Sequence, residues 1–97
     1  MMSAVENPKI SLQDLNDLED RIKNNRATSE DYSVLDNYLS FLGVKNYILS
    51  TLEKHRINGY EEFIDQRKNY SSSEINMLVG SVLGVISTLK KYITGKL

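Results

Sequence analysis

The sequence contains no cysteine and no tryptophan, and among its 97 residues there are one proline and five glycines. The absence of cysteine excludes a disulfide framework, a cysteine-ligated zinc or iron–sulfur site and a thiol nucleophile. The scarcity of proline and glycine argues against a small β-domain, because such a domain needs turn residues at short intervals. Long helices therefore have to form the core without covalent support. A chain without disulfides also suits the cytoplasm, where we expect this protein to reside.

A chain of 97 residues has the size of one domain, and its 40% hydrophobic and 26% charged residues are typical of a globular protein. The net charge of −1 does not indicate a nucleic-acid-binding protein, because such proteins are commonly strongly basic. Residues 1–53 carry nine acidic and five basic side chains, whereas residues 54–97 carry four acidic and seven basic ones. This opposite charge favours antiparallel packing of helices, within one chain or between two copies.

Residues 1–10 are predicted to form a disordered leader, and residues 11–97 a single helical domain. The leader has neither the basic start nor the apolar segment of a secretory signal. Pro8 also disfavours helix at the residue before it.

Short polar motifs mark the predicted helix boundaries. A serine or threonine followed three positions later by an acidic residue has the spacing of a capping box, which begins a helix. A glycine at the end of a helix, or an Asn-Gly pair, predicts a turn. Gly43 is interpreted as a corner between two helices, and one continuous helix over about 29–55 is the alternative. The capping pairs are Ser11 with Asp14, Thr28 with Asp31 and Ser71 with Glu74, and the Asn-Gly turn is Asn58-Gly59.

These boundaries and the helical spacing of apolar residues predict an all-α fold, a compact bundle of four or five helices. The predicted core consists of Leu35, Leu39, Leu42, Ile48, Leu52, Phe63, Ile64, Leu78, Val82, Ile86 and Leu89.

The last predicted helix is apolar on almost every side. Its uncharged stretch, Ile75 to Leu89, measures about 22 Å as a helix, and a hydrocarbon core is about 30 Å thick, so we expect no membrane span. Gly80 and Gly84 lie four residues apart and leave one side flat, although each costs about 1 kcal/mol relative to alanine. Few other helices are available to cover this segment, and we therefore expect a homo-oligomer. In the alternative, the glycines accommodate Phe41 or Tyr38 of the same chain.

The first predicted helix carries a narrow apolar stripe that resembles a coiled-coil seam more than the broad face of a core helix. We expect this stripe and the two glycines to form the self-association surface. Its candidate residues are Leu15, Leu18, Ile22, Gly80 and Gly84.

Six tyrosines and several basic residues provide a second set of candidates. A tyrosine ring can stack on a base, and arginine or lysine can bind phosphate. Tyr60, Arg56, Arg67 and Lys68 are therefore candidate contacts for a partner or a small ligand. A nucleotide-binding site at a subunit interface, or regulation of a nucleic-acid process, is the corresponding alternative function.

Catalysis has no candidate residue in the sequence. His55 is the only histidine, and phosphate-binding and metal-binding motifs are absent. We therefore expect no enzyme activity, no metal and no cofactor.

Part of the chain resembles a known interaction module. Its elements are Leu35-x-x-Tyr38-Leu39-x-x-Leu42-Gly43-Val44-x-x-Tyr47, then Ile57-Asn58-Gly59 and Leu83-Gly84. Over roughly residues 29–95 this pattern is similar to a SAM domain, although a tyrosine stands where that family usually has tryptophan. The resemblance implies five helices and a tendency to self-polymerise. It agrees with the function that we expect, a non-catalytic helical module that self-associates and binds an unknown protein partner.

Overall fold

The computed structural model describes residues 10–69 and 72–95, and these ranges contain five helices. They are α1 (Leu12–Lys23), α2 (Ser29–Phe41), α3 (Tyr47–Lys54), α4 (Tyr60–Asn69) and α5 (Ser73–Thr94). The predicted all-α class is confirmed. The predicted leader lies, except for Ile10, outside the described residues.

Two of the predicted capping boxes form as expected. The Ser11 and Thr28 hydroxyls accept hydrogen bonds from the backbone N–H groups of Asp14 and Asp31, at 3.0 and 3.2 Å. Both aspartates in turn accept from the backbone N–H of the capping residue. These reciprocal bonds satisfy N–H groups that have no partner in the first turn of a helix.

The cap of α5 differs from the prediction by one residue. The predicted capping residue, Ser71, lies outside the described residues, and α5 is capped by Ser72, whose hydroxyl accepts from the Ile75 N–H at 3.1 Å. With Ser72 as the cap, the third position of the helix is occupied by Ile75 and not by Glu74. The Oε1 atom of Glu74 lies 2.8 Å from Nδ1 of His55, which connects the end of α3 to the start of α5.

The chain turns sharply between α2 and α3, as predicted. Gly43 has a φ of +99°, a region that favours glycine, and Asn46 before α3 is also left-handed, with a φ of +51°. The alternative of one continuous helix through Gly43 is therefore wrong.

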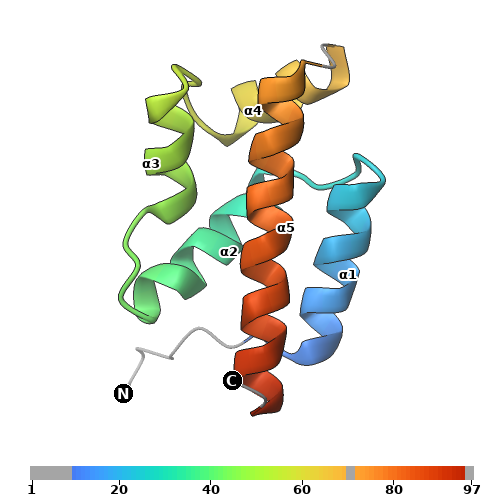
Figure 1. Ribbon diagram of the computed structural model, residues 1–97, viewed down its shortest axis with the longest axis vertical. Helices are drawn as coiled ribbons and strands as arrows, with labels where there is room; N and C mark the ends of the chain where they lie inside the picture. The colour runs from blue at the N-terminus through green and yellow to red at the C-terminus, as the bar shows by residue number, and fades with distance from the viewer. Residues whose placement is uncertain (1–9, 70–71, 96–97) are drawn as a thin grey trace, which may run out of the picture.

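The longest helix, α5, packs against α1, α3 and α4, and α1 provides its largest contact. In Figure 1, α5 lies between α1 and α3, and α2 crosses behind it. One ion pair joins α5 to α1: the Lys90 Nζ atom donates to Glu19 Oε1 at 3.0 Å and to Asn16 Oδ1 at 3.1 Å. The face of α5 that is turned toward α1 is thus fixed.

The core is larger than the sequence predicts. Nine of the predicted core residues are buried, and Leu42 and Ile64 are only partly buried. The additional buried hydrophobic residues are Leu15, Leu18, Ile22, Ala27, Tyr32, Tyr38, Ile57, Ile75 and Val79.

Candidate interaction surface along α5

Helix α5 has two different faces, and the prediction that it is apolar on almost every side is wrong for one of them. The buried face consists of Ile75, Leu78, Val79, Val82, Ile86 and Leu89. The opposite face is exposed and contains small or uncharged polar side chains over most of its length. The described residues therefore cover one side of the longest helix and leave its other side exposed.

We call the exposed stripe of α5 the α5 seam. Its residues follow each other at alternating spacings of three and four, which places them on one side of the helix. All of them are exposed, and the Met77 side chain retains 70% of its accessible surface. The α5 seam consists of Glu74, Met77, Ser81, Gly84, Thr88 and Lys91.

The glycines of α5 face open space. A Cβ atom added at Gly80 or Gly84 would meet no heavy atom of residues 10–69 and 72–95 within 4 Å. Phe41 is 49% exposed, and Tyr38 is buried elsewhere in the core. The alternative in which the glycines accommodate these two side chains is therefore wrong.

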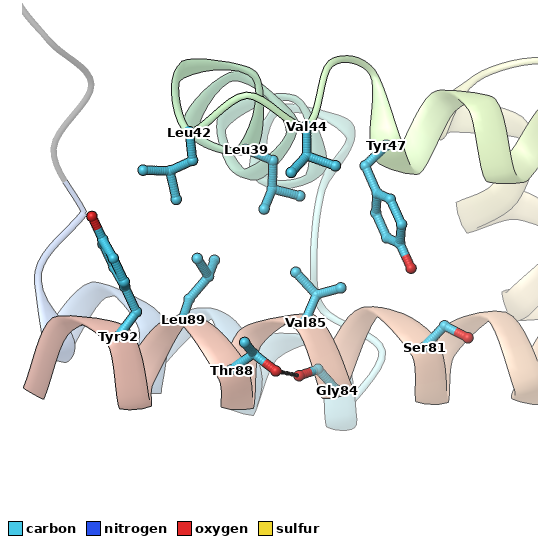
Figure 2. A pocket seen from close by; sticks show the side chains of 10 residues that line it. All are labelled: Leu39, Leu42, Val44, Tyr47, Ser81, Gly84, Val85, Thr88, Leu89 and Tyr92. Atoms are coloured by element: carbon cyan, nitrogen blue, oxygen red, sulfur yellow. Dashed lines mark hydrogen bonds between the residues drawn. The ribbon is translucent and has the colours of Figure 1, made fainter. Parts of the chain in front are cut away.

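An apolar groove runs beside the seam, between α5 and the corner that joins α2 to α3. It has a volume of about 650 Å³. Figure 2 shows Val44 and Tyr47 on the corner side facing Val85 and Leu89 on α5, with Tyr92 at one end. The complete lining is Leu39, Leu42, Val44, Tyr47, Ser81, Gly84, Val85, Thr88, Leu89 and Tyr92. The groove and the seam thus form one continuous surface without an acidic residue in the groove wall.

A buried carboxylate fixes the wall of this groove that α3 provides. Asp36 on α2 is 3% exposed and accepts bonds from the backbone N–H groups of Ile48 at 2.9 Å and Leu49 at 3.1 Å. Asn46, the capping residue of α3, makes no side-chain cap bond. Asp36 therefore caps α3 from a neighbouring helix, and Tyr47 is held at the start of α3 facing the groove.

Tyr60 on α4 completes the Asp36 network by donating its hydroxyl hydrogen to Asp36 Oδ2 at 2.7 Å. Burial raises the pKa of Tyr60, and the hydrogen bond to Asp36 and the charge of that carboxylate raise it further. Its ring also stacks on Tyr32, with 6.4 Å between ring centroids and 11° between planes. Tyr60 is thus part of the packing and is not a free platform for a base.

Of the other predicted contact residues, Arg67 lies close to Tyr60, whereas Arg56 and Lys68 lie elsewhere. Arg56 is exposed after α3 in a left-handed conformation, with a φ of +61°. Arg67 is partly buried on α4 beside Tyr32, on whose ring Tyr60 stacks. Lys68 is exposed and borders a separate shallow hollow that also includes Arg26. The structure does not bring Tyr60, Arg56, Arg67 and Lys68 together in one site.

The stripe on α1 is also placed differently from the sequence-based expectation. Leu15 and Ile22 are 0% exposed and Leu18 is 5% exposed, within the core of the chain. They are not available to a second copy in the folded protein. Of the predicted self-association residues, only Gly80 and Gly84 lie on an exposed surface.

Two further features bear on the chemistry of the chain. In residues 10–69 and 72–95, no group of three or more histidine, aspartate or glutamate residues is placed to hold a metal ion. Within the same ranges α5, with 22 residues, is the one helix that is long and apolar enough by length and composition to cross a membrane.

Comparison of the chain with protein-family models, with curated proteins and with solved structures finds no match. The range 29–95 that resembles a SAM domain contains four helices in its described residues, α2 to α5, whereas that family has five. The fifth helix of this chain, α1, precedes the range.

Proposed function

We propose that this chain is a non-catalytic protein–protein interaction module of the cytoplasm, and that it self-associates through the α5 seam and the adjoining groove. The observation that carries the proposal is the absence of charge between Glu74 and Lys91 on the seam. An exposed helix face in a monomeric protein commonly carries charged residues.

The energetics of α5 support the same proposal. Each glycine inside a helix costs about 1 kcal/mol relative to alanine, and in the part of the chain that the structure describes neither Gly80 nor Gly84 has a neighbour that needs the space. A second helix that packs on this side can use the space, because small residues allow two backbones to approach closely. Exposed apolar side chains at Val44, Met77 and Tyr92 add hydrophobic area around the glycines.

Sedimentation equilibrium at micromolar concentration tests the proposal. The wild-type chain is expected to self-associate, and Gly84→Leu is expected to weaken the association at least tenfold, equivalent to about 1.4 kcal/mol. Ser87→Leu is the matched control, because Ser87 is also exposed on α5 but lies outside the seam. A strict monomer at every concentration contradicts the proposal, and so does an association that Gly84→Leu and Ser87→Leu leave equally unchanged.

A further inference from the structure

We infer that the occupant of the α5 seam is a second copy of this chain, whose α5 packs antiparallel against the first. The inference rests on the proposed self-association and specifies its geometry. A two-fold axis passes between Ser81 and Gly84, so that each copy presents the same residues to the other, as a closed dimer requires.

The spacing of the seam supports a helix pair. From Glu74 to Lys91 its residues are separated by three, four, three, four and three positions. This is the alternation of the two contact positions in a coiled coil. The smallest residues, Ser81 and Gly84, occupy the centre, where the two helices come closest in the inferred arrangement.

Charge complementarity between Glu74 and Lys91 favours a second copy as the occupant and an antiparallel orientation of its α5. In the antiparallel register, Glu74 of one copy lies opposite Lys91 of the other, and the two-fold axis generates this pair twice. Both side chains are exposed, and Lys91 makes no ion pair within residues 10–69 and 72–95. A parallel arrangement would instead bring glutamate against glutamate and lysine against lysine, which is destabilising.

The same antiparallel register brings the groove of each copy into the contact. Met77 of one copy lies opposite Thr88 of the other, one turn of α5 from Tyr92. Thr88 and Tyr92 both line the groove, and Met77 is 70% exposed in the single chain. Each methionine therefore reaches the groove of the other copy, where its sulfur can contact the tyrosine ring.

Charge reversal tests the register. Glu74→Lys and Lys91→Glu each convert two attractive pairs into two repulsive ones, and each is expected to raise the dimer dissociation constant roughly tenfold. The double variant Glu74→Lys/Lys91→Glu restores opposite charges and is expected to return within about threefold of wild type. Because Glu74 also contacts His55, circular dichroism of each variant verifies that the monomer is folded. The inference is overturned if the single variants dimerise as tightly as the wild-type chain. It is also overturned if the double variant dimerises as weakly as the single variants.

Disulfide trapping gives an independent test, because the chain contains no cysteine. The Met77→Cys and Thr88→Cys proteins are prepared separately, mixed and oxidised. The antiparallel register predicts that oxidation of an equimolar mixture gives almost exclusively the cross-linked heterodimer of the two variants, well above the share that random pairing produces. A heterodimer share at or below that of random pairing overturns the inference but leaves the proposed function intact if sedimentation shows a dimer. A wild-type chain that is monomeric in sedimentation overturns both.

Discussion

The carboxylate of Asp36 connects three helices, because it lies on α2, caps α3 and accepts a hydrogen bond from Tyr60 on α4. Because this carboxylate is buried, the loss of its hydrogen bonds is expected to lower the stability of the fold. A buried donor that loses its acceptor costs about 1–3 kcal/mol, and loss of a helix cap costs about 0.5–2 kcal/mol.

Replacement of Asp36 by alanine is therefore expected to lower the free energy of unfolding by about 2–4 kcal/mol. Urea denaturation followed by circular dichroism measures the change. Tyr60→Phe removes one of the three bonds and is expected to cost about 1 kcal/mol. Asp17→Ala on the exposed side of α1 serves as the control, with a change within about 0.5 kcal/mol. Equal effects of Asp36→Ala and Asp17→Ala would show that Asp36 does not organise α3.

Among the helices, α1 and α2 are joined by a bidentate pair in which Arg21 Nε and Nη2 each lie 3.1 Å from one oxygen of Asp31. Asp31 also accepts from the Thr28 N–H at 2.9 Å. Burial acts to raise the pKa of Asp31, but the hydrogen bonds from Thr28 and Arg21 and the charge of Arg21 outweigh it, so the pKa is lowered.

This lowered pKa has a defined consequence for stability. A carboxyl with a lower pKa in the folded state stabilises the fold above its unfolded pKa of about 3.9, and the contribution is lost as the pH falls through the folded value. Asp31→Asn is expected to cost about 1 kcal/mol at pH 7, because Arg21 is partly exposed and its charge is screened. The difference between wild type and Asp31→Asn in urea denaturation is expected to shrink below about pH 4. A difference that stays constant from about pH 7 to about pH 2.5 would contradict the assignment.

The two glycines of α5 affect folding and association in opposite directions. Since a Cβ atom at Gly84 meets no neighbour, Gly84→Ala is expected to stabilise the monomer by about 1 kcal/mol. The same methyl group separates the paired helices, so the dimer is expected to weaken roughly tenfold. Gly80→Ala is the comparison, because Gly80 lies beside the seam. The substitution is expected to stabilise the helix by the same amount and to weaken the dimer less. Urea denaturation at low concentration and sedimentation separate the two effects. Gly84→Ala that strengthens association would contradict the inferred contact.

For the molecule as a whole, local signals in the sequence predict the helices well, because caps and turns depend on neighbouring residues. Ser11, Thr28 and Gly43 act at the positions where short motifs place them. The apolar stripe of α1 shows the limit of such reasoning: its period identifies the buried face but not the helix that covers it. Asp36 gives no local signal, because its partners lie 12, 13 and 24 residues away.

The candidate surface was predictable in part. Gly80 and Gly84 are visible as a motif, and their exposed position follows only from the packing of α1 on the opposite side of α5. The groove combines two segments that are distant in the sequence, the α2–α3 corner and the second half of α5. No spacing in the sequence indicates that these two segments lie together. The groove could therefore be located only from the tertiary structure.

The tertiary arrangement also bears on whether α5 enters a membrane, which its length and composition would permit. Insertion would separate the buried face of α5 from α1, and it would break the 3.0 Å bond between Lys90 and Glu19. A charged side chain at the bilayer centre costs at least about 2.5 kcal/mol. We therefore expect the folded chain to remain in the aqueous fraction when it is mixed with phosphatidylcholine vesicles and centrifuged through a density gradient. Asp36→Ala, which loosens the fold, is expected to increase the bound fraction. Flotation of the wild-type chain with the vesicles would instead identify the exposed face of α5 as a surface for lipid.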